Sequence, residues 1–311
     1  MERGDPGASD EVREFVMARP GAALRPYVDW YAGYREAEVA PGTHRGLPSP
    51  QLTLIFTLDE PLEMAAHPDP RQPPGSFDAL VGGLHTRPAL ITHPGRQSGV
   101  QIALSAVGAR ALLGLPAGEI ASRDLAASDV LGGAFVDEMR GRLLAARSWA
   151  ERTRIVEDLL VGRLDASGAP AAVNAVRPEV LHVWRTQLAC GGRASVPELA
   201  ASVGWSERYL RARFQAEFGV GPKTFARLVR FSSARTAMPA ALRSGASLAS
   251  VAAQHGYYDQ AHLAAEFRSF AGCAPTAWLA EEFRILQDVE AVREEDSRYE
   301  RSRNPRDPGH P

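Results

Sequence analysis

Lysine is almost absent from this sequence of 311 residues, since Lys223 is the only lysine among 35 basic residues. The abundance of arginine, alanine and glycine in its place indicates GC-rich coding and a bacterial source. Cysteine is also scarce: Cys190 and Cys273 are too few for a disulfide framework or a four-ligand zinc site, which favours a reducing compartment. No apolar run approaches the roughly 18 residues of a membrane span, and MERGDPGASD lacks the apolar segment of a signal peptide. We therefore expect a cytoplasmic protein that does not associate with membranes.

The charge is balanced over the whole chain but not along it. The 35 basic residues nearly offset 37 acidic ones, for a net charge of −2. Between Arg193 and Arg284, however, eleven basic residues face seven acidic ones. A local excess of positive charge at the C-terminal end favours a polyanionic partner there.

The pattern of apolar residues divides the chain into four stretches and predicts an α+β fold. Residues 1–20 are polar and contain Pro and Gly, so we expect them to be flexible. Residues 21–167 form a predicted β-rich domain with a helical connector: YVDWYAGY, QLTLIFTL, ALVGGL, ALITH and GVQIAL read as strands, and three helical stretches follow. A linker at Gly168 and Pro170 leads to an all-α region over residues 174–284. Residues 285–311, which are charged and poor in large apolar side chains, predict a disordered tail.

The C-terminal region contains two copies of one motif. LAASVGWSERYLRARFQAEFGVGP, from Leu199, aligns with VAAQHGYYDQAHLAAEFRSFAGCAP, from Val251. Each copy is predicted to form a short helix, a tight turn at a glycine (Gly204 or Gly256), a polar N-cap and a second helix. An aromatic residue after the glycine is expected to fill the angle between the two helices, as a plug. This order is that of a helix-turn-helix, whose second helix lies in the major groove of DNA. The equivalent pairs are Leu210 with Leu263, Phe214 with Phe267, Gly219 with Gly272, and Pro222 with Pro275; Trp205 and Tyr257 are the plugs, and Ser206 and Asp259 the N-caps.

Helical periodicity gives each second helix an inward and an outward face. In the first copy, the inward positions Leu210 and Phe214 leave four residues outward as candidates for base contacts: Arg208, Arg211, Ala212 and Gln215. Arginine and glutamine suit bidentate hydrogen bonds to guanine and adenine. In the second copy the outward positions include three alanines, Ala261, Ala264 and Ala265, with Gln260 and His262 as base-contact candidates at the margins. We therefore expect the first copy to read sequence and the second to contribute placement and DNA shape.

Four basic residues are candidates for contacts to DNA phosphates, which position a protein without specifying sequence: Lys223, Arg230, Arg235 and Arg268. The alternative is that each is an ordinary solvated side chain on a helix.

The doubled motif resembles the C-terminal domain of AraC/XylS-type transcriptional regulators. The resemblance covers about Pro178 to Phe283 and implies a DNA-binding domain that places two recognition helices in successive major-groove segments, usually bending the DNA. One departure is Pro239, where the family continues with an apolar helix former; it predicts that the helix between the copies, from about Thr224 to Met238, ends or kinks there. The matching residues are Leu199-Ala200, Gly204-Trp205-Ser206, Tyr209-Leu210, Phe214, Gly219, Pro222, Ala252, Gly256-Tyr257, Asp259, His262-Leu263, Phe267, Gly272, Pro275 and Trp278.

The resemblance also implies an N-terminal effector-binding or dimerising domain, often a cupin-like β-barrel followed by helices. The stretches PGTHRGLPSPQLTLIFTL, FDALVGGLHTRPALI and GRQSGVQIALSAVGARALLGLP are similar to the N-terminal domain of a subset of these regulators. Four residues expected in loops are candidates for holding an anionic or polar effector: His44, Arg45, Arg87 and Arg96. The alternative is that they are surface residues or form interface salt bridges. The helices from Val130 to Leu164, with Phe135, Met139, Leu143 and Leu144 on one face, either cover the barrel or form a dimer seam.

The metal-binding motifs H-x-H and H-E-x-x-H and the catalytic motif G-x-S-x-G do not occur in the sequence. We therefore expect no enzyme activity, no metal and no cofactor. The sequence predicts a transcription regulator that binds double-stranded DNA, with a small-molecule effector, a homodimer partner and RNA polymerase as further expected partners. Two alternatives stay open: a cupin-like enzyme with accessory DNA binding, and an interaction module whose helix-turn-helix has lost DNA binding.

Overall fold

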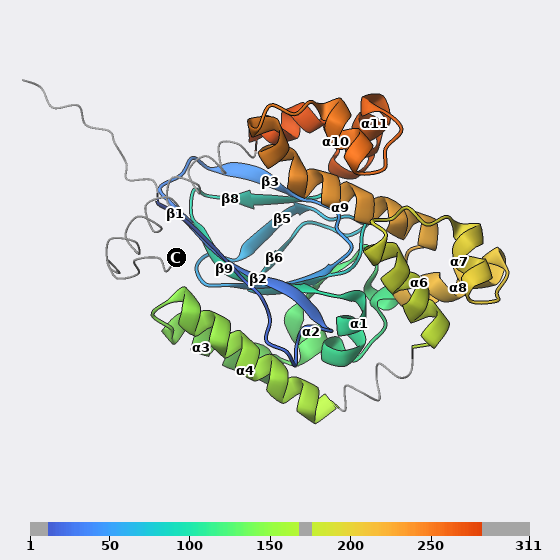
Figure 1. Cartoon of the computed structure of the whole chain (residues 1–311). Helices are drawn as coiled ribbons and strands as arrows, with labels where there is room; N and C mark the ends of the chain where they lie inside the picture. Colours follow the sequence, from blue (N-terminus) through green and yellow to red (C-terminus); the bar gives the residue numbers. More distant parts are fainter. Residues whose placement is uncertain (1–11, 168–175, 282–311) are drawn as a thin grey trace, which may run out of the picture.

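The computed structural model describes residues 12–167 and 176–281. Its β-rich part is followed by a helical connector and then by an all-helical C-terminal part (Figure 1). The strands are β1 (Val12–Ala18), β2 (Val28–Ala37), β3 (Gly42–Gly46), β4 (Leu52–Thr57), β5 (Leu62–Ala66), β6 (Gly75–Phe77), β7 (Ala79–Gly82), β8 (Ala89–His93), β9 (Gln97–Leu104) and β10 (Asp124–Ala126). The connector contains α1 (Ala106–Gly108), the π-helical turn η1 (Ala109–Leu113), the 3-10 turn η2 (Ala117–Ile120), α2 (Ala127–Leu131), α3 (Gly133–Ala145) and α4 (Trp149–Ser167). The C-terminal helices are α6 (Pro178–Ala189), α7 (Val196–Ser202), α8 (Glu207–Phe218), α9 (Pro222–Arg243), α10 (Leu248–Gln254) and α11 (Gln260–Ala271).

The strands form two antiparallel sheets. One has six strands in the order β1-β2-β9-β4-β7-β10, and the other has four in the order β3-β8-β5-β6. The predicted α+β class with a β-rich N-terminal part is confirmed. Within the described residues, however, no strand pair joins the two sheets, so the expected cupin-like barrel is not closed.

A small apolar cluster holds the two sheets face to face. Ile55 and Leu80 come from the six-stranded sheet, and Leu62, Met64 and Ile91 come from the four-stranded one. Because side chains alternate between the faces of a strand, these positions bury one face of each sheet and fix their separation.

The expectation of a flexible stretch up to residue 20 is wrong for Val12–Ala18. These residues form β1, which pairs along its length with β2 in the register Val12↔Ala37 to Ala18↔Tyr31. Backbone hydrogen bonds to an existing strand stabilise a segment whose composition alone is unremarkable, and this pairing is not visible in the sequence pattern. Residues 1–11, the predicted linker at Gly168 and Pro170 and the predicted tail at 285–311 lie outside the described residues.

The connector helices α3 and α4 come after the strands in the chain and pack against the main core. In Figure 1, α3 and α4 lie on the side of the sheets opposite to α9. Met139 and Leu143 of α3 are fully buried in the main core, and Phe135 packs against that core. Leu144 was expected on the same face but is 52% exposed, because consecutive helical residues point about 100° apart.

The helix between the two copies, α9, extends beyond the proline that was expected to end or kink it. It continues through Pro239 to Arg243, although proline cannot donate the helical hydrogen bond. Met238 is fully buried in the core of the second copy, and Pro239 is buried as well. Tertiary packing thus offsets the cost of the missing bond. None of the helices in the described part of the chain is long and apolar enough to cross a membrane.

Gly204 and Gly219 have the same left-handed backbone conformation but different surroundings. Alanine substitutions at the two positions therefore distinguish the cost of backbone strain from the cost of steric overlap. Gly204 has φ 68° with open space where a Cβ would lie, whereas Gly219 has φ 75° and its Cβ would lie 2.2 Å from the Cβ of Ala121. We expect Gly204→Ala to cost about 1–2 kcal/mol of unfolding free energy, from the left-handed backbone alone. Gly219→Ala should cost about 1–3 kcal/mol more, because the new methyl group overlaps Ala121. Urea unfolding of both variants measures the difference, and equal costs would show that the Gly219 contact with Ala121 is not made in solution.

Candidate nucleic-acid interface

The two sequence copies fold as two equivalent helix-turn-helix units. The first unit is α7 and α8, and the second unit is α10 and α11. Both second helices begin at the predicted N-caps: Ser206 accepts a hydrogen bond from the Tyr209 amide, and Asp259 accepts one from the His262 amide at 2.7 Å. Both end at a left-handed glycine, Gly219 or Gly272.

The turns of the two units also match in their hydrogen bonds. The amide of Trp205 donates to the Ala200 carbonyl at 2.9 Å, and the amide of Tyr257 donates to the Ala252 carbonyl at the same distance. The predicted aromatic plugs are present, since Tyr257 is buried and Trp205 is half-buried. Two turns of the same geometry therefore hold two second helices against a common partner, α9.

The outward face of α8 carries the residues predicted to contact bases. Leu210 and Phe214 are fully buried. All four candidates on the other face are exposed: Arg208, Arg211, Ala212 and Gln215. An exposed stripe of two guanidinium groups and an amide, on a helix fixed by its buried stripe, can make bidentate hydrogen bonds to base edges.

The outward face of α11 is poorer in hydrogen-bonding groups. Ala261 and Ala265 are exposed, and Gln260 and His262 are exposed at the start of the helix. The His262 ring is already engaged: its Nδ1 accepts from the Tyr258 amide at 3.3 Å, and the His262 and Tyr257 rings meet edge to face. This helix can contact DNA mainly through its shape and through Arg268, which is exposed near its C-terminal end.

The four phosphate-contact candidates have different surroundings. Lys223 and Arg268 are exposed. Arg230 is half-buried and donates to the Gly192 carbonyl at 2.7 Å, while its guanidinium group lies 6.0 Å from the centre of the Tyr257 ring. Arg235 is half-buried on α9.

A buried polar network that the sequence pattern missed holds α11 on α9. Glu266 is buried and accepts hydrogen bonds from the Tyr257 hydroxyl at 3.1 Å and from Nε of Arg227 at 3.0 Å. Burial and the neighbouring carboxylate raise the pKa of Tyr257 well above its usual value, so its hydroxyl stays a donor. Helical periodicity places Glu266 next to the inward Phe267. A carboxylate beside the buried stripe is the one feature of the sequence that could have indicated this network.

The four effector-pocket candidates do not come together in one pocket. His44 and Arg45 lie within β3, which corrects the expectation that they occupy loops. They are neighbours on a strand, so their side chains point to opposite faces. Arg45 forms an ion pair with Glu281 beyond α11, and Arg87 is exposed in the β7–β8 connection. Arg96 pairs with Glu60.

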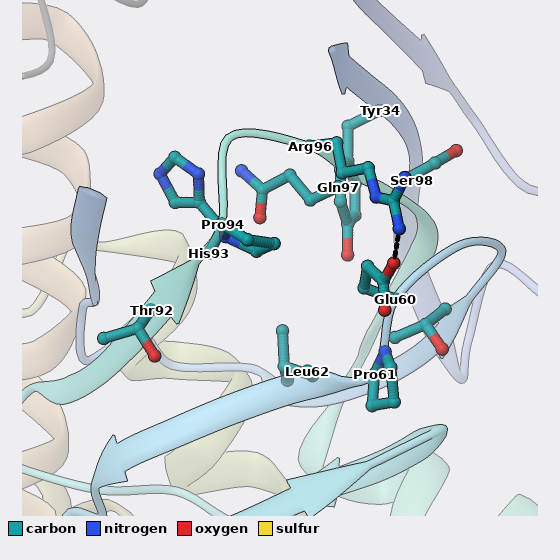
Figure 2. A pocket seen from close by; sticks show the side chains of 11 residues that line it. Tyr34, Glu60, Pro61, Leu62, Thr92, His93, Pro94, Arg96, Gln97 and Ser98 are labelled. Carbon is teal, nitrogen blue, oxygen red and sulfur yellow. Dashed lines mark hydrogen bonds and ion pairs between the residues drawn. The ribbon is translucent and has the colours of Figure 1, made fainter. Parts of the chain in front are cut away.

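Of these candidates, only Arg96 lines the cavity drawn in Figure 2. This cavity lies between β2, β5 and the β8–β9 turn, with Tyr34, His93 and Gln97 among its other lining residues. Its volume of about 10 Å³ is the space of a single water molecule. It is too small to hold an effector in this conformation. No cluster of three or more metal-ligating side chains occurs among the residues that the structure describes.

Comparison with known proteins identifies the helix-turn-helix units. Residues 199–281 match a family model described as a helix-turn-helix domain, and this match covers both units and the helix between them. These residues therefore form a helix-turn-helix domain of the AraC/XylS type. The predicted double helix-turn-helix at the C-terminal end is thereby confirmed.

The N-terminal part of the chain matches a second model, over residues 17–126, described as a domain of unknown function, DUF6597. No curated protein sequence gives a significant match. Among solved structures the chain is similar to ToxT from Vibrio cholerae O395, at 11% identity and a TM-score of 0.47 over 80% of this chain and 96% of that one. It is also similar to an unsaturated-fatty-acid-bound ToxT from Vibrio cholerae strain SCE256 (10% identity, TM-score 0.46, 90% and 97% coverage) and to the AraC-like transcriptional activator CuxR (13%, 0.27, 75% and 89%).

We expect the stability of the N-terminal domain to decrease in acid because of His44. Burial first, and then the nearby His93, lower the pKa of His44 from 6.5 to about 4. The unfolded chain therefore binds the proton more readily, and stability present above pH 6.5 is lost as the pH falls from 6.5 towards 4, by at most about 1.4 kcal/mol per pH unit. We expect His44→Asn to flatten this loss in urea unfolding followed against pH. His182→Asn, at an exposed position on α6, is the control and should keep the wild-type slope.

Proposed function

We propose that the chain is a sequence-specific DNA-binding transcription regulator in which α8 reads bases, α11 contributes placement and DNA shape, and the N-terminal domain receives a controlling signal. The observation that carries this proposal is the exposed face of α8, where Arg208, Arg211 and Gln215 lie together on a helix whose opposite face is buried. The positive excess between Arg193 and Arg284 supports attraction to DNA in general.

The controlling signal is a small molecule or a protein partner that acts on the N-terminal domain. The four polar candidates lie apart, and the cavity beside Arg96 holds one water molecule, so a ligand in that region requires a rearrangement of the β8–β9 turn. A homodimer through α3 and α4 and contact with RNA polymerase stay predictions from the family resemblance.

Replacement of either arginine on α8 should remove specificity at defined base pairs. A bidentate pair between arginine and guanine contributes about 1–3 kcal/mol of discrimination, so Arg208→Ala and Arg211→Ala should each weaken binding to the selected site by roughly 5- to 150-fold. Sequence preference should relax only at the base pairs that each residue contacts. Binding-site selection with the full chain, followed by affinity measurements on single-base variants of the selected site, checks this.

The control for these substitutions is Arg185→Ala, which removes the same charge from an exposed position on α6. It should leave the selected sequence unchanged. If both α8 variants selected the wild-type site with wild-type affinity, α8 would not be the reading helix. Two equally informative half-motifs would contradict the unequal roles of α8 and α11.

Two other functions give different results in simple measurements. A cupin-like enzyme would carry a metal, so stoichiometric iron, zinc or manganese in the purified protein would revive that alternative; we expect none. An interaction module that has lost DNA reading would bind selected and random duplexes with equal affinity, and both affinities would fall equally with salt.

A further inference from the structure

The N-terminal domain contacts the same structural position in both helix-turn-helix units. The glycine that ends α8, Gly219, lies against Gly118 and Ala121: a Cβ at Gly219 would be 3.1 Å from the Gly118 Cα and 2.2 Å from the Ala121 Cβ. The equivalent glycine after α11, Gly272, lies against Pro88 of the β7–β8 connection, where a Cβ would be 3.7 Å from the proline Cγ. Both recognition helices therefore rest on the N-terminal domain at their C-terminal ends.

An ion pair strengthens the contact to the first unit. Arg110, in the π-helical turn η1, donates from Nε and Nη2 to the two carboxylate oxygens of Glu217 on α8, at 2.6 and 2.8 Å. The Glu217 side chain is only 10% exposed and that of Arg110 23%. The hydrogen bonds to Glu217 raise the pKa of Arg110, which keeps its guanidinium group charged. A bidentate pair of this kind fixes orientation as well as distance.

The two units differ in how firmly the N-terminal domain holds them. Leu210, Phe214 and Phe218 of the first unit belong to the same apolar core as the N-terminal strands. The second unit has its own core, against which Leu47 packs from the segment after β3, and Arg45 adds an ion pair with Glu281. The first unit is therefore joined to the N-terminal domain, and the second is held at its edge.

These contacts leave the DNA-facing surfaces open. Arg208 and Arg211 near the start of α8, and Gln260 and Ala261 at the start of α11, are exposed with the N-terminal domain in place. The start of a recognition helix is the part that contacts base edges. The N-terminal domain thus supports the helices from their far ends without covering the residues that would meet DNA.

Two units can engage one DNA site only at a defined relative placement, because successive major-groove segments on one face are about 34–36 Å apart. The helix α9 links the units, but Pro239 interrupts its hydrogen bonds close to the second unit. We propose that the N-terminal domain holds the two units at the placement in which both engage DNA, and that Arg110 is a positioning residue for this through Glu217. The inference rests on the DNA-binding function proposed above.

The test compares Arg110→Met with Arg140→Met in the full chain. Arg140 is a matched control, since it pairs with Asp78 inside the N-terminal domain and its side chain is 25% exposed. Affinity is measured on the wild-type selected duplex over a salt series, with hydroxyl-radical footprints of both groove segments. For Arg110→Met we expect roughly tenfold weaker binding, within the usual range of coupling between two sites. We also expect a shallower dependence of log affinity on log salt, by about 0.9 for each phosphate that the variant no longer neutralises. Protection should persist under α8 and fade under α11.

Two further variants separate positioning from folding. Arg110→Lys keeps the charge but not the bidentate geometry, and should fall between wild type and Arg110→Met. The exchange of Arg110→Glu with Glu217→Arg should restore the salt slope and the second footprint. A general decrease in folded protein would lower the active fraction without changing the salt slope.

The salt slope and the footprint together decide whether Arg110 positions the units. If Arg110→Met and Arg140→Met had the same salt slope and footprint, the positioning role would be wrong. Tighter binding by Arg110→Met than by wild type would also overturn it, because the contact would then restrain DNA binding. A wild-type chain that bound no selected duplex better than random DNA would instead refute the proposed DNA-reading function, and the positioning role with it.

Discussion

Burial of one apolar stripe on each recognition helix is the constraint on which the rest of the C-terminal part depends. Leu210 and Phe214 in α8, and Leu263 and Phe267 in α11, are fully buried. A helix that buries this stripe has no freedom to rotate about its axis, so the identity of the opposite face is fixed. Arg208 and Arg211 of α8 face solvent because Leu210 and Phe214, on the opposite face of the helix, are held in the core.

The parts of the fold that were predictable from the sequence are those specified by local chemistry. Caps at Ser206 and Asp259, glycine turns and the inward stripes each depend on a few residues close in the chain, and their repetition about 52 residues later made the pattern specific. The strand β1 was missed because its structure comes from pairing with β2, and β3 was read as a loop because GTHRG has no apolar alternation. The continuation of α9 past Pro239 has a related cause. Proline locally favours an end or a kink, but the packing of Met238 in the second core keeps the helix going.

The polar contacts between the N-terminal domain and the helix-turn-helix units could not be predicted from the sequence. Glu217 sits among the inward residues of α8, where a carboxylate is costly unless it is paired, and its partner Arg110 lies 107 positions earlier. The equivalent position in the second unit is Phe270, which is fully buried. The sequence therefore shows a polar residue in one copy and an aromatic residue in the other. It does not indicate which arginine pairs with the carboxylate.

This asymmetry at one position has a physical consequence for the two units. Phe270 completes the core of the second unit from within, and Arg227 of α9 lies over its ring at 4.8 Å. At the same helical position, the buried Glu217 pairs with Arg110 of the N-terminal domain. Removal of that partner would leave a poorly solvated carboxylate at the end of α8. At this position the first unit therefore depends on the N-terminal domain for the partner of its carboxylate, whereas the second unit fills the position from its own core. A signal that changed η1 or the segment around Gly118 would reach α8, the helix proposed to read bases, directly through Glu217 and Gly219. It would not have to pass through α9.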